Sequence, residues 1–462
     1  MNTIKTNIIP TSQTFSEVSG EQGLDLKAIC VFCAIGFFLD EDTFWKHKVV
    51  LRAASEHTIN DEGVRENSKP WFNWYYDPKD LSFNEALDGF TDLFETIVKE
   101  QTAGKKVILP LSGGLDSRTQ AAALHHIKAD VFSYSYKFAN GFDEVNIASE
   151  IAEKCGFDFK DYTIEPGYLW NKIDQLGNLN GYYSSLTVPR QMAIYDEYKT
   201  MGDTFSLGHW GDVLFDSMNV PEDMPQEEQI DLLIKKLIKR GGQQLAEDLW
   251  KGWQLEGNFM DYFRSRVSNL LKSIKIDNAN SRLRAFKSLY WAPRWTSINL
   301  SVFEAHHPIA LPYYDNRMCN FICNIPEDYL KDRQLQIAYI KKRSKELASI
   351  VWQDKRPFNL NNFENGNKLA HFSYRLKSKL KRSLNEVLGK PHIQRNWELQ
   401  FLGKDNEQML YQNLTNANFT SWIPKSIIEG KLSEFYKGDR LYNAHQVDML
   451  LVLSKFWSQH GG

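Results

Sequence analysis

The sequence predicts an α/β protein with a parallel sheet, a helical C-terminal extension and a small β-rich N-terminal part. The first observation is that an apolar run at 107–111 precedes a turn at 112–117 that reads Ser-Gly-Gly-Leu-Asp-Ser, and an alanine-rich helical segment follows. The second is that strand-like and helical segments alternate from residue 130 to residue 207, as they do in parallel α/β units. A chain of 462 residues is long enough for two or three core-forming units.

The composition is that of a folded protein with no excess of either charge. Apolar residues make up 42% of the chain, and 55 basic residues face 58 acidic ones for a net charge of −3. This balance argues against nucleic acid as a partner. No signal peptide is visible in residues 1–28, and the longest apolar run, 28–39, is too short to cross a bilayer. A sparse, odd set of five cysteines suits a reducing compartment, so we expect a cytoplasmic protein.

The N-terminal part divides into a polar segment and a small β-rich unit. Residues 1–24 are polar and are expected to be loosely ordered. Residues 25–80 alternate short apolar segments with turn signals, which predicts strands, and the run 28–39 is interpreted as a buried strand. Cys30 and Cys33 lie in that run, but no second cysteine pair completes a zinc site, so we interpret them as core residues.

Residues 81–462 form the main unit, and its first half alternates helix and strand. Apolar residues three or four apart predict a helix over 81–99, which leads into the strand before the glycine-rich turn. Further strands are predicted at 130–136, 157–164 and 204–207, and helices at 143–155 and 189–201. The loops at 112–117 and 208–212 both follow strands, and open parallel sheets bind ligands at the carboxyl ends of their strands. We therefore expect both loops to line one crevice.

The rest of the chain is predicted to be mainly helical. Residues 221–275 are charged and glutamine-rich and are interpreted as a helical insertion, and residues 447–457 as a buried closing helix. Residues 371–388 form a basic amphipathic pattern. This pattern fits a core-facing helix with a charged outer face, and it also fits a helix that contacts a membrane surface or an acidic substrate.

The turn at 112–117 has the residues of an anion site. Its two glycines let the backbone approach a phosphate, and the start of the following helix presents free N–H groups. Ser112 and Ser117 add hydroxyl donors, whereas Asp116 would repel a bare phosphate and so indicates a bridging Mg²⁺. The turn lacks the Gly-Lys-Ser/Thr of a Walker loop, which argues against the usual transfer of a γ-phosphate.

This turn resembles the pyrophosphate loop of the ATP pyrophosphatase (PP-loop) superfamily, and further segments resemble the synthetase half of asparagine synthetase. Residues 207–212 resemble the second loop of that family, 312–317 its PFLD-type segment, 355–358 its K-x-x-F element and 450–457 its last helix. The resemblance covers about residues 25–460. It implies a parallel-sheet domain of the adenine nucleotide alpha hydrolase type that cleaves ATP between its α and β phosphates.

The resemblance also implies roles for individual residues. It places ATP at the two loops with Mg²⁺ between two aspartates, and it assigns to Lys355 the stabilisation of charge around the adenylate. The nucleotide-binding positions are Leu111, Ser112, Gly113, Gly114, Asp116, Ser117, Ser206, Leu207 and Gly208. The metal-binding positions are Asp116 and Asp212.

Two departures from the family pattern concern the nitrogen donor and the acid. Glutamine-hydrolysing members have a catalytic cysteine where this chain has Asn2, and residues 25–80 resemble only the end of a glutaminase domain. We therefore expect no glutaminase activity of its own. Residues 308–311 lack the Glu-Ala-Arg that usually precedes the PFLD-type segment, so aspartate is not assumed to be the substrate.

Two further residues depart from the pattern near the phosphates. His209 stands where asparagine synthetases have a glutamate, and a pKa near working pH makes it a candidate general base. The alternative is that His209 packs beside Trp210 or bonds the nucleotide. Arg118, directly after the turn, is interpreted either as a phosphate contact or as a surface residue.

Together these observations predict an ATP-dependent ligase that adenylates a carboxylate, releases pyrophosphate and transfers the acyl group to ammonia or an amine. The acid is expected to be a small molecule, a glycan or a peptide, and a separate glutaminase is one source of ammonia. Two alternatives stay open. One is a tailoring amidotransferase or cyclase with the same adenylation chemistry, and the other is a non-catalytic nucleotide-binding relative.

Overall fold

A five-stranded sheet lies at the centre of the computed structural model, which describes residues 1–141, 145–364 and 392–461. The strand order is β10-β9-β6-β7-β8, and every neighbouring pair is parallel. The strands are β6 Val107–Pro110, β7 Val131–Phe138, β8 Asp158–Ile164, β9 Thr204–Ser206 and β10 Ile309–Ala310. The parallel α/β fold is therefore confirmed.

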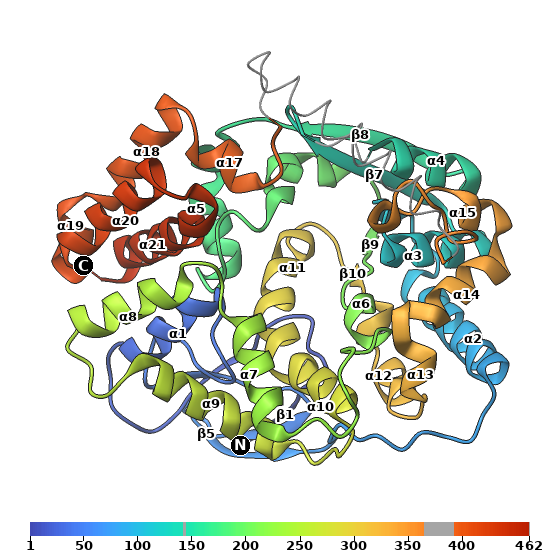
Figure 1. Cartoon of the computed structure of the whole chain (residues 1–462), viewed down its shortest axis with the longest axis horizontal. Helices are drawn as coiled ribbons and strands as arrows, with labels where there is room; N and C mark the ends of the chain where they lie inside the picture. The colour runs from blue at the N-terminus through green and yellow to red at the C-terminus, as the bar shows by residue number, and fades with distance from the viewer. Residues whose placement is uncertain (142–144, 365–391, 462) are drawn as a thin grey trace.

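Helices cover the sheet because its central strand is apolar throughout. Val107, Ile108 and Leu109 of β6 are fully buried, as expected of a parallel strand that is covered on both faces. α3 (Leu115–His126) follows β6, and α2 (Phe83–Thr102) and α14 (Gln334–Arg343) pack against it. Ser82 and Glu85 form the capping box that begins α2. Figure 1 shows these helices beside the sheet, with the C-terminal helices on the far side of the molecule.

The elements predicted around the sheet are largely confirmed. α2, β7, β8, β9 and α4 (Val145–Cys155) match the predicted segments, and residues 143 and 144 lie outside the described residues. The predicted helix at 189–201 is instead the 3₁₀ helix η1 (Arg190–Thr200), whose backbone leaves the helical region at Ile194, with φ −118°. The tighter 3₁₀ turns and the bend at Ile194 replace the regular α-helix that was predicted for this segment.

The N-terminal part corrects two expectations. The run 28–39 was expected to be a strand, but it contributes most of the helix α1 (Leu26–Ile35), which Asp25 caps and Gly36 ends at φ 83°. All of its residues from Ala28 to Ile35 are buried, and a fully apolar run has no period that distinguishes strand from helix. Cys30 and Cys33 are buried within it, as their interpretation as core residues requires.

Residues 1–24 were expected to be loosely ordered, yet they contribute two strands. β1 (Asn2–Lys5) pairs with β4 (Ser55–Ile59), which also pairs with β5 (Arg65–Pro70), and β2 (Phe15–Glu17) pairs with β3 (Lys48–Val50). All of these pairs are antiparallel. These strands are short and largely polar, so the sequence shows no alternation of apolar and polar residues that would predict them.

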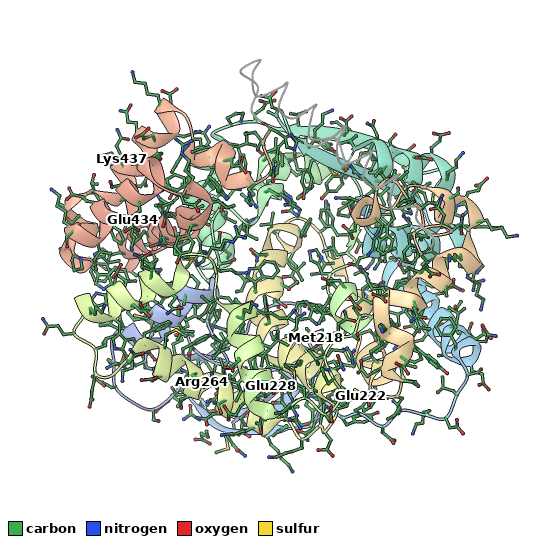
Figure 2. The ribbon with its side chains drawn as sticks, in the orientation of Figure 1. Met218, Glu222, Glu228, Arg264, Glu434 and Lys437 are labelled. Carbon is green, nitrogen blue, oxygen red and sulfur yellow. The ribbon has the colours of Figure 1, made fainter. Side chains whose placement is uncertain are left out.

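The segment at 221–275 is helical, as predicted. It contains α7 (Gln226–Leu237), α8 (Gly242–Gly252) and α9 (Phe259–Ser273), and α10 (Ala279–Phe286) follows. Arg264 of α9 forms ion pairs with Asp231 and, at 2.9 Å, with Glu227, both on α7. Figure 2 labels Arg264 on α9 and Glu228 on α7. α8 packs against α1, so this segment and the N-terminal part share a core.

The C-terminal part is helical, and the closing helix is confirmed. The helices are α17 Asn396–Phe401, α18 Lys404–Leu414, α19 Ala417–Trp422, α20 Lys425–Lys437 and α21 Arg440–His460. Residues 447–454 of α21 are all buried. The amphipathic segment 371–388 lies outside the described residues. No helix in the described parts of the chain is both long and apolar enough to cross a membrane.

The remaining elements are short or lie close to the cavity described below. They are α5 Tyr168–Asn180, α6 Gly211–Leu214, η2 Lys287–Thr296, α11 Ser297–Glu304, η3 Pro312–Tyr314, α12 Asn316–Ile322, α13 Glu327–Leu330, η4 Lys331–Arg333, α15 Lys345–Ser349 and η5 Gln353–Lys355.

The buried Asp448 in the closing helix predicts a pH dependence of the stability of the fold. Its carboxylate is 4% exposed and accepts hydrogen bonds from Ser185 and, at 2.7 Å, from Thr187. Burial raises its pKa to about 6, so the folded state loses stability as the pH rises from 3.8 to about 6. Asp448→Asn keeps a hydrogen-bond acceptor without the charge. Between pH 3.8 and about 6 we expect the free energy of unfolding of this variant to rise by about 3 kcal/mol relative to that of the native chain. Urea denaturation at several pH values measures this, and a pH-independent difference would contradict it.

Candidate active site

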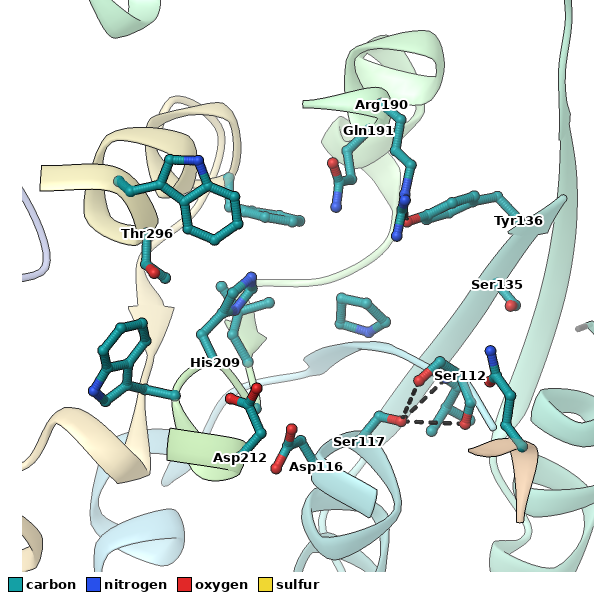
Figure 3. Close-up of a pocket in the computed structure, with 18 of the residues that line it drawn as sticks. Ser112, Asp116, Ser117, Ser135, Tyr136, Arg190, Gln191, His209, Asp212 and Thr296 are labelled. Carbon is teal, nitrogen blue, oxygen red and sulfur yellow. Dashed lines mark hydrogen bonds between the residues drawn. The ribbon is translucent and has the colours of Figure 1, made fainter. Parts of the chain in front are cut away.

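One cavity lies at the carboxyl ends of β6, β7 and β9, where the two predicted loops meet. Its volume is about 650 Å³. The loop at 112–117 contributes Ser112, Asp116 and Ser117, and the loop at 208–212 contributes Gly208, His209 and Asp212 (Figure 3). The convergence expected from the strand ends is thus observed, since open parallel sheets form their ligand crevices at the carboxyl ends of the strands.

The turn before α3 presents a set of donors to this cavity. The Ser112 N–H donates to Ser117 Oγ at 3.1 Å, the two hydroxyl oxygens lie 3.0 Å apart, and the Gly114 N–H points to Ser112 Oγ at 3.3 Å. Gly114 is the N-cap of α3 and has no side chain to cap it. The free N–H groups and the positive end of the helix dipole therefore remain available to an anion.

Glycines bring the two loops into direct contact. A Cβ on Gly113 would lie 2.8 Å from the Cβ of Gln353, and one on Gly208 would lie 2.9 Å from the Cβ of Asp116. Such distances are shorter than non-bonded carbons tolerate. The absence of a side chain at Gly208 therefore lets the second loop approach Asp116, and its absence at Gly113 lets Gln353 approach the first loop.

Asp116 and Asp212 form the acidic edge of the cavity. Asp116 is 27% exposed; it pairs with Arg333 and accepts a hydrogen bond from Gln336 Nε2 at 3.2 Å. Burial raises the pKa of the Asp116 carboxyl, Arg333 opposes the increase and Asp212 adds to it. Two carboxylates on one edge, facing a set of phosphate donors, fit Mg²⁺, which usually takes one or two protein carboxylates together with phosphate oxygens.

Arg333 and Gln336 were missed by the sequence analysis. Both reach Asp116 from η4 and α14, more than 200 residues along the chain. Arg333 has a left-handed backbone with φ 62°, next to Asp332 at φ 53°. Non-glycine residues in this region are uncommon, so the local conformation is held by the contacts it makes.

His209 lines the cavity between the two carboxylates and an aromatic wall. Its side chain is half-buried, Phe303 packs against the ring, and its Nδ1 is buried without a hydrogen-bond partner among the described residues. Burial lowers its pKa to about 4, against the opposing effect of Asp212. The expectation that His209 has a pKa near working pH is therefore wrong. The imidazole is neutral at neutral pH and so has a lone pair that can accept a proton.

The other predicted nucleotide positions divide between the cavity and its support. Leu111, Leu207 and Gly208 line the cavity. Ser206 is buried, and its hydroxyl donates to Gln120 Oε1 at 2.8 Å, which joins β9 to α3. Ser206 thus supports the cavity wall from behind and is not part of the lining.

Lys355 lies away from the cavity lining in this structure. Its side chain is exposed, and its Nζ lies 5.8 Å from the ring centroid of Trp352. Gln353 of the same short helix does line the cavity, and its N–H donates to the Gly113 carbonyl at 3.2 Å. The role assigned to Lys355 by resemblance therefore stays a prediction.

Arg118 has neither of the two positions expected for it. It is fully buried and donates to four backbone carbonyls: Gly113 at 3.3 Å, Leu347 at 3.2 Å, Ile350 at 3.0 Å and Val351 at 2.8 Å. Burial lowers its pKa to about 10. The side chain holds the segment before Gln353 against the glycine-rich turn, and its sequence position alone could not show this.

Comparison with known proteins agrees with this geometry. The family model described as asparagine synthase matches residues 89–424. The chain belongs to the asparagine synthase family. The resemblance stated from the sequence is confirmed, and membership in this family indicates an ATP-dependent ligase of the PP-loop class.

Other comparisons add little to the family match. No curated protein matches the chain. Among solved structures, an NMN synthetase from Francisella tularensis is similar at 13% identity over 45% of this chain and 93% of that one, with a TM-score of 0.23. This likeness is too weak to carry an argument about the site, which rests on the geometry above.

Proposed function

We propose that this member of the asparagine synthase family adenylates a substrate carboxylate and transfers the acyl group to ammonia or an amine. The observation that carries the proposal is the pairing of Asp116 and Asp212 at the edge of a cavity that also contains the donors of the glycine-rich turn. The donors of the turn, together with Mg²⁺ that the two aspartates would hold, would stabilise the negative charge that develops on a pyrophosphate leaving group. The products are an amide, AMP and pyrophosphate.

Each part of the site has a role in this reaction. Ser112, Ser117 and the start of α3 bind the phosphates that leave, and Leu111 and Leu207 contact the nucleotide base. Mg²⁺, held by Asp116 and Asp212, would offset the charge of those phosphates. His209 accepts a proton from the attacking nitrogen, and the aromatic wall beside it excludes water that would hydrolyse an activated acid.

Pyrophosphate release tests the proposal directly. The chain is incubated with Mg²⁺, ATP and a panel of acids, with ammonia or glutamine supplied as the nitrogen donor. We expect AMP and pyrophosphate to form in equal amounts with at least one acid, and glutamine to work no better than equal ammonia. Formation of ADP and phosphate, or no acid-dependent nucleotide turnover, would contradict the proposal and favour the non-catalytic alternative.

His209→Gln tests the assignment of the base. We expect ATP binding to be unchanged and product formation to fall at least a hundredfold, because general base catalysis contributes about 10²- to 10⁴-fold. Activity of the native chain should not fall from pH 8 to pH 6 through this residue, since its pKa is lowered to about 4. His460→Gln, at an exposed position, is the matched control. Equal turnover of both variants would remove His209 from the mechanism.

A further inference from the structure

A ten-residue π-helix forms the wall of the cavity that faces the glycine-rich turn. This helix, η2, runs over Lys287–Thr296 and contains Pro293. Lys287, Trp291, Trp295 and Thr296 line the cavity; the first three are spaced four residues apart, and Thr296 directly follows Trp295. π-helices are rare, usually a single turn long, and frequent at functional sites. Their wider turn here places a lysine and two indoles on the same face.

The N-terminal part of the chain holds this wall in place. Arg294 is buried and donates to the carbonyls of Phe38 at 3.1 Å and Asp42 at 2.5 Å, and Gln13 Nε2 donates to the Pro293 carbonyl at 3.0 Å. Trp291 stacks on Phe37 with ring centroids 5.6 Å apart. The indoles of the wall are therefore fixed before any ligand arrives, which reduces the entropy lost on binding.

Lys287 is the charged residue of this wall. Its side chain is half-buried, and its Nζ lies 5.9 Å from the ring centroids of both Trp210 and Trp291. It forms no ion pair with any residue that the structure describes. Burial lowers its pKa, and the charge of Asp212 opposes this. A partly desolvated cation that faces a cavity without a carboxylate partner favours an anionic group on a ligand.

The wall is distinct from the nucleotide side of the cavity. Figure 3 shows Thr296 across the cavity from Ser112 and Ser117, with His209 and Asp212 between them. Ser112 and Ser117 thus lie on one side, and the other side holds Thr296 of η2, the helix that also carries the cavity-lining Trp291 and Trp295. Phe303 packs against His209. Flat aromatic faces bind the apolar face of a ring, and a small open-chain amino acid would leave them uncovered.

We propose that the π-helical wall binds the acyl substrate and that this substrate is a carboxylic acid carrying a ring. The ring lies against Trp291 and Trp295, and Lys287 binds the carboxylate beside Asp212. This inference rests on the proposed function and names its substrate class. A sugar acid and an aromatic acid share this chemistry, and the experiment separates them.

Binding is measured by calorimetry on the full chain with Mg²⁺ and a non-hydrolysable ATP analogue. The probes are glucuronate for a pyranose acid, benzoate for an aromatic acid and aspartate for an open-chain acid. We expect one of the two ring acids to bind at least tenfold more tightly than aspartate. Tighter binding of aspartate, or no binding of either ring acid, would overturn the proposal.

Variants assign the binding to the wall. We expect Lys287→Met to lower the affinity for the ring acid at least tenfold and Lys287→Arg to retain part of that affinity. Trp295→Leu should lower the affinity for the ring acid about tenfold. Lys404→Met, at an exposed lysine of α18, should leave the affinity for the ring acid unchanged. The affinity for the ATP analogue should be equal in all of them, which also shows that they fold. Loss of ATP-analogue affinity in Lys287→Met would overturn the proposal by placing this lysine at the nucleotide.

The readout separates this inference from the proposed function. Ring-acid binding at the wall without acid-dependent pyrophosphate release would count against adenylation and leave the wall assignment standing. Pyrophosphate release that is best with aspartate would uphold adenylation and overturn the ring-acid proposal.

Discussion

Replacing Asp116 with asparagine is expected to lower acid-dependent pyrophosphate release at least a hundredfold. Asp116 is the carboxylate at which the two loops meet, and it lies beside Asp212. Asp116 would act through the Mg²⁺ that it helps to hold, and loss of one stabilising group for developing charge costs about 10²- to 10³-fold in rate. Asparagine keeps the shape of the side chain and its contact with Arg333 in part, so the loss should be one of chemistry, with the thermal unfolding temperature nearly unchanged.

A variant of Asp212 and a variant of a surface aspartate show whether the loss of rate is specific to this edge of the cavity. Asp212→Asn should reduce the rate as much as Asp116→Asn, and the double variant little further, because residues that act as one unit are not additive. Asp223→Asn, at an exposed position, should retain the native rate. If Asp116→Asn kept more than a tenth of the native rate, the proposed charge stabilisation at this edge would be wrong.

Loss of the buried Arg284–Glu327 pair is expected to have the largest effect on stability. Their side chains are only 3% and 4% exposed, and two hydrogen bonds of 2.6 Å and 2.7 Å join them. Arg284 also donates to the Asp216 carbonyl at 2.9 Å. Arg284→Ala leaves Glu327 charged and buried, so we expect the free energy of unfolding to fall by about 3–5 kcal/mol.

Replacing both Arg284 and Glu327 tests whether the unpaired buried charge causes this loss of stability. Arg284→Met combined with Glu327→Leu removes the charges and keeps most of the volume, so it should cost less than Arg284→Ala alone. Urea denaturation of the three chains compares these free energies. A double variant less stable than the single one would show that the pair contributes attraction beyond avoiding an unpaired charge.

The sheet and both loops could be predicted because local pattern determines them. β6 is apolar throughout and meets a glycine-rich turn, and the loop at 208–212 again follows a strand. Parallel topology then brings both loops to one edge without any knowledge of tertiary contacts. This topology brings Asp116 and Asp212 to one edge, whereas their assignment as metal ligands came from the family resemblance and stays a prediction.

Other residues of the site depend on contacts that no local pattern encodes. Arg118 was interpreted as a phosphate contact or a surface residue, but three of the four carbonyls to which it donates lie more than 200 residues away. Lys287 has no motif around it, and its position follows from the π-helical turn of η2. The helix α1 was mistaken for a strand because its side chains are apolar on every side, which removes the period that separates the two.

The contact between the N-terminal part and the π-helix affects how natural variation in this chain should be interpreted. The family match begins at residue 89, yet Gln13, Phe37 and Phe38 hold the wall that faces the ligand. Related chains that differ at Gln13 or Phe37, whose side chains make these contacts, are therefore expected to prefer different acids even where the cavity-lining residues are the same. A fragment that begins at the family match would lack this support, and its substrate preference would not represent that of the whole chain.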